Sequence, residues 1–158
     1  MKYLEQIRVD ERLIHGQVLI KWLDLQKNCN EIVIVDDVIA ENPILRSIME
    51  KSLPKEYHLE IYSVLDDDQY LETFEKKNNS LVLVRNLITL RKIWEKNIKV
   101  NKINIARLPF KNGKEKIWEN IYMSGEEKLF LKTVLESGSE VYVQMVPDSE
   151  KIMIKDVL

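Results

Sequence analysis

A histidine beside a glycine follows a short run of charged residues in the stretch VDERLIHGQV, residues 9–18. This histidine, His15, is one of two in the chain. A neutral imidazole is a good nucleophile and can form a covalent intermediate. A phosphoryl group in a loose transition state needs positioning and charge stabilisation more than acid–base help. The stretch therefore makes His15 a candidate for accepting a phosphoryl group.

The neighbours of His15 include the groups that such a reaction needs. Backbone N–H groups at the start of a helix, here around Gly16 and Gln17, can bind a phosphate. Gly16 has no side chain that could block the approach of a phosphate. Arg12 adds a permanent positive charge, and Asp10 could accept a hydrogen bond from one ring nitrogen and so fix the tautomer. The open alternative is that His15 only satisfies a local hydrogen bond at a helix start.

Other groups in the sequence are weaker candidates. Asp36 and Asp37 end an apolar run and could act as a catalytic pair, although acids in that position commonly cap the next helix. Arg85 either faces the same site or is solvated. His58 begins a predicted strand, and we interpret it as structural. The two histidines are far apart and no Cys or His cluster accompanies them, so no metal site is predicted. The chain has no nucleotide-binding or nucleophile-elbow motif, and we expect no cofactor.

Apolar runs of strand type alternate with stretches of helical periodicity along the chain. The runs predict strands over 4–9, 31–37, 57–64, 80–86, 102–108 and 140–146, helices over 16–26, 40–52, 66–77, 87–97 and 124–137, and a short hairpin within 109–123. Strands that alternate with helices predict an α/β fold. We expect a doubly wound, mostly parallel central sheet flanked by helices, with a short C-terminal hairpin or antiparallel edge.

The predicted sheet places the candidate residues together. In doubly wound sheets, ligands bind beyond the carboxyl ends of the strands. His15 follows the first predicted strand, the acid pair follows the second, and Arg85 follows the fourth. We therefore expect these loops to share one edge of the sheet. We also expect the apolar Leu13 and Ile14 to flank the nucleophile where a partner docks.

The composition bounds the kind of protein. A chain of 158 residues with 45% hydrophobic and 32% charged residues has the size of one globular domain, and we assign residues 1–158 to it. A formal net charge of −2 gives no support to nucleic acid as a partner. The N-terminus is too charged for a signal peptide, and no apolar run approaches the roughly 18 residues of a membrane span. Cys29 is the single cysteine of the sequence, so it cannot form an internal disulfide. We expect a cytoplasmic protein.

The segment RVDERLIHGQV at residues 8–18 resembles the active-site segment of a known family. The family is the IIB component of the mannose/fructose/sorbose family of the bacterial phosphoenolpyruvate-dependent sugar phosphotransferase system. The resemblance extends over nearly the whole chain. It includes IVIVDDVIAENPILRSIM (32–49), SLVLVRN (80–86), KINI (102–105), FKNGKEKIWENIYMSGEE (110–127) and VYVQMVP (141–147).

The resemblance implies a cytoplasmic phosphocarrier that associates peripherally with the inner face of the membrane through the IIC and IID components. The IIA component would pass the phosphoryl group of its phosphohistidine to Nδ1 of His15. His15 would then pass the group to a sugar bound by IIC and IID. The matching site residues are the phosphate-binding Arg12, Gly16 and Gln17 and the loop acids Asp10 and Asp37.

The chain departs from the family's usual pattern at three places. The chain has Ala106 and Arg107 where the family usually has a glycine pair, Leu87 after Asn86 where it has a proline, and Val38 where it has an acid. The glycines let the backbone come close to the active loop. Larger side chains should narrow that approach, although Arg107 could instead add a phosphate contact.

These departures keep two further hypotheses open. The chain could be a regulatory or binding relative that keeps the fold and senses phosphorylation state without supplying a transporter. It could also be an unrelated doubly wound domain that binds a small anion and forms no stable covalent phosphate. The sequence identifies neither the sugar nor the oligomeric state, and a homo-oligomer remains open.

Overall fold

The computed structural model describes residues 2–25, 29–77 and 79–158, without the side chains of residues 17 and 18. Its main sheet has seven strands in the order β3-β2-β4-β1-β5-β8-β9. Every neighbouring pair is parallel except β8 and β9. The strands of this sheet are β1 (Lys2–Asp10), β2 (Glu31–Val35), β3 (His58–Tyr62), β4 (Leu81–Val84), β5 (Ile98–Arg107), β8 (Glu140–Val143) and β9 (Ile152–Met153). The separate antiparallel pair is β6 (Glu115–Trp118) and β7 (Ile121–Met123).

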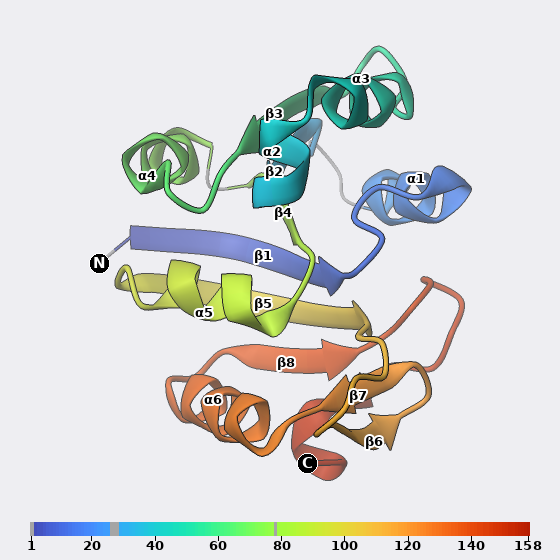
Figure 1. Cartoon of the computed structure of the whole chain (residues 1–158), viewed down its shortest axis with the longest axis vertical. Coiled ribbons are helices and arrows are strands. Elements are labelled where there is room, and N and C mark those ends of the chain that lie inside the picture. The colour runs from blue at the N-terminus through green and yellow to red at the C-terminus, as the bar shows by residue number, and fades with distance from the viewer. Residues whose placement is uncertain (1, 26–28, 78) are drawn as a thin grey trace.

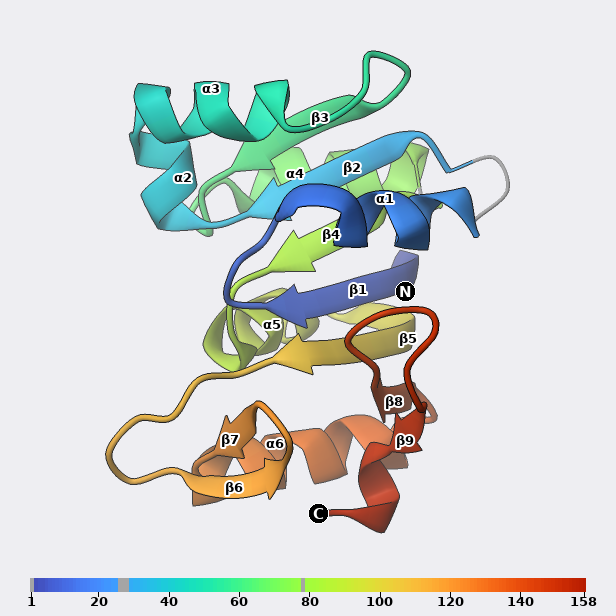
Figure 2. The same cartoon turned by 90° about the vertical axis from the view of Figure 1, so that its right-hand side faces the viewer.

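Helices cover both faces of the sheet. They are α1 (Gly16–Asp24), α2 (Asp37–Glu41), α3 (Pro43–Lys51), α4 (Asp67–Lys76), α5 (Leu87–Trp94) and α6 (Gly125–Glu136), followed by the 3₁₀ turn η1 (Ile154–Asp156). Figure 1 shows α4, α5 and α6 on one face, and α1 and α3 on the other, which faces the viewer in Figure 2. Within the described ranges, no helix combines the length and the apolar character needed to cross a membrane.

The hydrophobic core is divided by the sheet, because successive strand residues point to opposite faces. Val33 of β2 packs in the cluster that contains Tyr70 of α4. Its neighbour Ile32 packs in the other cluster, which contains Leu19 of α1. Burying side chains of this size is worth about 1.5–3 kcal/mol each, so both helical layers are bound to the sheet.

The predicted α/β class and mostly parallel sheet are confirmed, with changes at two places. The antiparallel edge of the main sheet is β9, while the predicted hairpin forms its own small sheet. The helix predicted over 40–52 is two helices. Asp36 caps α2 by accepting a hydrogen bond from the N–H of Ile39 (3.1 Å). Asn42 then adopts an extended backbone and caps α3, whose first residue is Pro43.

The strand ends bring distant loops to one edge. β1, β2, β4 and β5 all run in the same direction, so the loops that follow them lie at the same edge, which we call the carboxyl edge. β1 is central, with β4 on one side and β5 on the other. The loop after β1 therefore lies in the middle of the carboxyl edge, and this loop contains His15.

Candidate functional site

The loop between β1 and α1, residues 11–15, is held in a conformation that its sequence does not favour. Leu13 has a left-handed φ of 55°, and its N–H donates to the carbonyl of Asp10 (3.0 Å) to close a turn. This conformation costs about 1–2 kcal/mol for a residue with a side chain. Burial of Leu13 (1% exposed) offsets that cost. Ile14 is also buried (6% exposed). The prediction that these two residues flank the nucleophile at the surface is therefore wrong, because they anchor the loop in the core.

Asp10, the last residue of β1, organises the charges of the site. Its side chain is only 1% exposed, and Arg12 donates to it through three groups. The backbone N–H and Nε of Arg12 bind Oδ1 (2.9 and 3.1 Å), and Nη2 binds Oδ2 (3.0 Å). A two-pronged, charge-assisted pair of this kind fixes both side chains. Since Asp10 engages Nε and Nη2, the Nη1 group of Arg12 is left to bind another acceptor.

His15 lies between two hydrogen-bond acceptors. Its Nδ1 is 3.4 Å from the carbonyl oxygen of Leu13, whereas its Nε2 is buried 3.7 Å from Oδ2 of Asp10 and has no hydrogen-bond partner among the described residues. The side chain is 18% exposed. Burial lowers the pKa of His15, and the positive charges of Arg12 and Arg8 act in the same direction, against Asp10 and the Leu13 carbonyl. At neutral pH the ring is thus neutral and has a lone pair on one nitrogen.

The start of α1 leaves room for an anion beside His15. His15 is the N-cap residue, with an extended backbone (φ −141°, ψ 100°), and its side chain makes no capping hydrogen bond. Gly16 has a φ of 52°, and no other group lies within 4 Å of the place where a Cβ would stand. Gln17 is in the first turn, and its side chain lies outside the described part of the chain. Backbone N–H groups at such a helix start favour negative charge.

Arg8, two residues before Asp10 on β1, is a member of the site that the sequence pattern did not single out. It is 2% exposed, and its Nη2 is 3.5 Å from Oδ2 of Asp10. It also donates to the carbonyls of Met145 (2.8 Å) and Gln144 (3.5 Å), and its guanidinium lies 5.1 Å from the ring of Trp22. Burial lowers the pKa of Arg8 to about 10, so the side chain stays charged.

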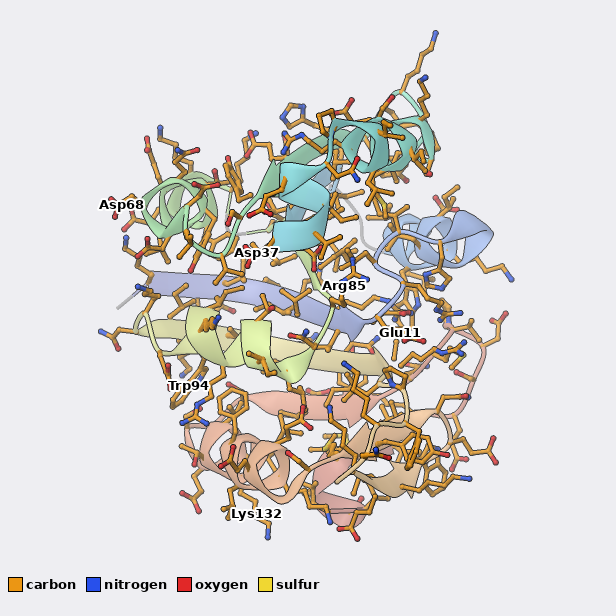
Figure 3. The ribbon with its side chains drawn as sticks, in the orientation of Figure 1. Glu11, Asp37, Asp68, Arg85, Trp94 and Lys132 are labelled. Carbon is orange, nitrogen blue, oxygen red and sulfur yellow. The ribbon has the colours of Figure 1, made fainter. Side chains whose placement is uncertain are left out.

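The two acids after β2 have separate roles. Asp36 forms a bidentate pair with Arg85 (2.9 and 3.1 Å), and Arg85 also donates to the carbonyl of Glu11 (3.1 Å). Figure 3 shows Arg85 and Glu11 next to each other. Asp37 instead accepts from Ser63 (2.6 Å) and the following backbone N–H, which lower its pKa. The structure thus joins Asp36, through Arg85, to the His15 loop, and joins Asp37 to the loop after β3. Among the described residues, no group of three His, Cys, Asp or Glu could hold a metal ion.

Arg107, at the end of β5, contacts the same loop from the other side. Its Nε lies 2.7 Å from Oε1 of Glu11, and its carbonyl accepts a hydrogen bond from the Glu11 N–H (3.2 Å). The preceding Ala106 is buried. In this structure the Arg107 guanidinium therefore binds a carboxylate, and the phosphate contact suggested for it stays a prediction.

Residues 4–158 match the family described as the PTS system sorbose subfamily IIB component. The chain belongs to this family. This IIB chain is 26% identical, over 150 residues, to the N-acetylgalactosamine-specific phosphotransferase enzyme IIB component 1 of Escherichia coli K12, with 94% of each chain covered. It is also 21% identical to the mannose-specific EIIAB component of the same strain, over 96% of this chain and 47% of that protein.

A solved structure agrees with this membership. The N-acetylgalactosamine-specific IIB component 1 from Escherichia coli superposes on this IIB chain with a TM-score of 0.83 and 25% identity. The superposition covers 96% of this chain and 98% of the other. The resemblance that the sequence segments indicate is therefore confirmed at the level of family and fold.

Proposed function

We propose that this IIB chain carries a phosphoryl group on His15. It accepts the group from a phosphohistidine of the IIA component and transfers it to a sugar bound by the membrane IIC and IID components. Residues 1–158 act as one domain, which works in the cytoplasm and docks at the inner face of the membrane on IIC and IID. The observation that carries the proposal is a largely buried histidine at the N-cap of α1, with Nε2 3.7 Å from a carboxylate that an arginine holds in place.

The transfer needs one lone pair and no net proton movement in its first step. Nε2 of His15 is buried beside the Asp10 carboxylate (3.7 Å), so it is shielded from an incoming phosphoryl group and a hydrogen on it faces a negative charge. We therefore place the ring hydrogen on Nε2 and the lone pair on Nδ1 of His15. Nδ1 forms the new N–P bond while the N–P bond of the donor breaks and returns an electron pair to the donor's ring. In the second step a sugar hydroxyl forms an O–P bond, the N–P bond breaks, and the hydroxyl proton is released.

The negative charge of the moving phosphoryl group is balanced by groups that are already in place. Nη1 of Arg12 can bind one phosphoryl oxygen while Nε and Nη2 remain on Asp10. The N–H groups of the first turn of α1, at Gly16 and Gln17, can bind the others. Because these donors are fixed before the reaction, little reorganisation is needed during it.

Exposed apolar side chains surround the site and fit a protein donor. Val38, Leu65, Ile88 and Phe110 are all largely exposed. Each lies three or four residues after the end of a parallel strand, namely β2, β3, β4 and β5. We assign this apolar group on the carboxyl edge to docking of the IIA component, since the donor phosphohistidine must reach His15. The similarity to half of a mannose-specific EIIAB component supports a IIA partner.

Phosphoryl transfer from an isolated carrier tests the proposal. The chain is incubated with phosphorylated IIA, and protein-bound phosphate is measured before and after mild acid. We expect acid-labile phosphate on the unaltered chain and on a His58→Ala variant, and none on a His15→Ala variant. If the His15→Ala variant takes up the same label, the assignment of His15 is wrong.

A second candidate function is favoured by the Arg107–Glu11 ion pair, which occupies the place of the family's usual glycine pair. A regulatory relative would accept the phosphoryl group and use it to change its binding to another protein. Uptake of candidate sugars in cells that lack this chain separates the two functions. Loss of phosphorylation-dependent uptake of one sugar supports the carrier, and unchanged uptake of every sugar supports the regulator.

A further inference from the structure

Three polar side chains form a row across the middle of the sheet. In the register of the parallel strands, Arg8 of β1 lies opposite Asn104 of β5, and Asn104 lies opposite Tyr142 of β8. Arg8 and Asn104 are both buried, and they line one small cavity together with Tyr142. A buried charge is unfavourable unless it is paired and hydrogen-bonded. We therefore expect Arg8 to have a role that an apolar residue at position 8 could not perform.

One oxygen atom connects this row to the candidate phosphoryl acceptor. Oδ2 of Asp10 is 3.7 Å from Nε2 of His15, 3.0 Å from Nη2 of Arg12 and 3.5 Å from Nη2 of Arg8. Arg8 approaches it from the buried side, whereas Arg12 is partly exposed. The charge that His15 experiences from Asp10 thus depends on two guanidinium groups, and only Arg12 is placed to bind a phosphoryl group as well.

We propose that Arg8 is a positioning residue for phosphoryl transfer, which holds the Asp10 carboxylate toward His15 and balances part of its charge without touching the phosphoryl group. The proposal rests on the proposed function of His15 and extends it to the inside of the sheet. Arg8 stays beside Asp10 while Nη1 of Arg12 binds the phosphoryl group. The Met145 and Gln144 carbonyls and the face of Trp22 fix the direction of Arg8.

The Nε donor of Arg8 and the Oδ1 acceptor of Asn104 belong to residues that line the same cavity. Among the described residues, Nε of Arg8 and Oδ1 of Asn104 are buried and have no hydrogen-bond partner. Both side chains line one small cavity of about 10 Å³, together with Trp22 and Tyr142. A single water needs roughly 10–15 Å³ of such space and two or more polar partners. The proposal therefore includes one water that accepts from Nε of Arg8 and donates to Asn104.

Removing the charge of Arg8 should raise the pKa of His15. The groups that act on the ring are its own burial, Arg12 and Arg8, which disfavour the imidazolium, and Asp10 and the Leu13 carbonyl, which favour it. Without Arg8, only Arg12 balances the negative charge of Asp10. His15 then becomes protonated at a higher pH, so less of the nucleophilic form is present in mildly acidic solution.

The test compares three variants of the full chain. Arg8→Met removes the charge and keeps a long apolar stem, and Arg8→Lys keeps the charge. Arg91→Met is the matched control, because Arg91 is an exposed arginine on α5 that pairs with Glu95 (2.9 Å) and lies 5.9 Å from the ring of Phe130. For each folded variant, the titration of the His15 ring is followed by ¹⁵N NMR. The rate of phosphoryl acceptance from IIA is measured at pH 6 and pH 8.

We expect Arg8→Met to raise the pKa of His15, because one of the positive charges that oppose its protonation is removed. The acceptance rate should then fall by up to about tenfold at pH 6 and much less at pH 8. Arg8→Lys should recover most of both effects, and Arg91→Met should change neither. An unchanged His15 titration in folded Arg8→Met, or an equal shift in Arg91→Met, would overturn the proposal. The titration needs no phosphate, so it can fail or succeed independently of the proposed carrier function.

Discussion

The two histidines of the chain lie in two regions of the sheet that differ in how deeply their charged groups are buried. His15 is at the carboxyl edge, 18% exposed, beside Asp10, which is 1% exposed and bound by an arginine. His58 is at the opposite end of a strand, 56% exposed, with its Nε2 3.3 Å from Glu60. Glu60 is also near Lys77 (3.8 Å), so both regions contain a histidine, a carboxylate and a cation.

The comparison shows that a histidine, a carboxylate and a cation can form two different environments. At His58 the charged groups are accessible to water, which weakens each interaction. At His15 the loop holds the ring against a buried carboxylate, and burial keeps the ring neutral. The difference comes from the left-handed turn at Leu13 and from the central position of β1, which together place the loop at the middle of the carboxyl edge.

Removing the carboxylate in each region should give the largest contrast. Asp10→Asn leaves two guanidinium groups without a buried counter-charge, and breaking such a pair costs about 3–5 kcal/mol. We expect the free energy of unfolding, measured in urea, to fall by about 3 kcal/mol, with phosphoryl acceptance lost. Glu60→Gln should change the unfolding free energy by less than about 1 kcal/mol. Equal losses in the two variants would show that burial is not the deciding difference.

Removing the cation in each region should affect rate more than stability. Arg12→Gln deletes a fixed donor for the phosphoryl group, and loss of one such donor lowers a rate by about 100-fold. Lys77→Gln, the matched change beside His58, should leave the rate of phosphoryl acceptance from IIA unchanged. A normal rate in Arg12→Gln would mean that the backbone of α1 is sufficient to stabilise the charge.

Backbone strain at the start of α1 can be tested with two glycines that differ in their φ angle. Gly16 has a φ of 52°, and Gly125 at the start of α6 does not have a left-handed φ. At both positions the space that an added methyl group would occupy has no neighbouring atom within 4 Å. Gly16→Ala should lower the unfolding free energy by about 1 kcal/mol, and Gly125→Ala should not lower it. Circular dichroism melts of both variants measure this. If the two variants melt alike, the loop relaxes without strain.

The smallest expected effect is on the pH dependence of stability. Burial lowers the pKa of His15 below its ordinary value of 6.5, so below pH 6.5 the unfolded chain binds more protons at this residue than the folded chain. Stability from this residue is therefore present above pH 6.5 and is lost as the pH falls, at less than about 1.4 kcal/mol per pH unit. A His15→Gln variant should lose less stability between about pH 7 and pH 5 than the unaltered chain. Equal losses would place the ring in a solvent-like environment.

Strands β2 and β4 could be predicted because they are almost continuous apolar runs, whereas β1 and β5 also contain charged and polar residues. The run at 31–37 nevertheless ends as a strand at Val35, because Asp36 leaves the strand to cap α2. The helix predicted over 40–52 is broken at Asn42, whose side chain caps a second helix. Both differences come from side-chain caps, which compete with regular periodicity at single residues.

Asp10, Arg12 and His15 lie within six residues, so their spacing indicated a site. Arg85 could be placed at the same edge because it follows a predicted parallel strand, and its hydrogen bond to the Glu11 carbonyl agrees with that placement. Arg8 depends on carbonyls 136 and 137 residues away, and no local pattern contains that information. The burial of Leu13 likewise follows from the way its loop turns back onto the core, which an apolar residue in a loop does not reveal.

The most direct test of the account is the chemical state of the His15 ring itself. ¹⁵N and ³¹P NMR of the chain, before and after reaction with phosphorylated IIA, identify which ring nitrogen carries the hydrogen and which binds phosphorus. We expect a neutral ring at pH 7 with its hydrogen on Nε2, followed by a ³¹P–¹⁵N coupling at Nδ1 of His15. Phosphorus on Nε2, on His58 or on any other residue would contradict the account.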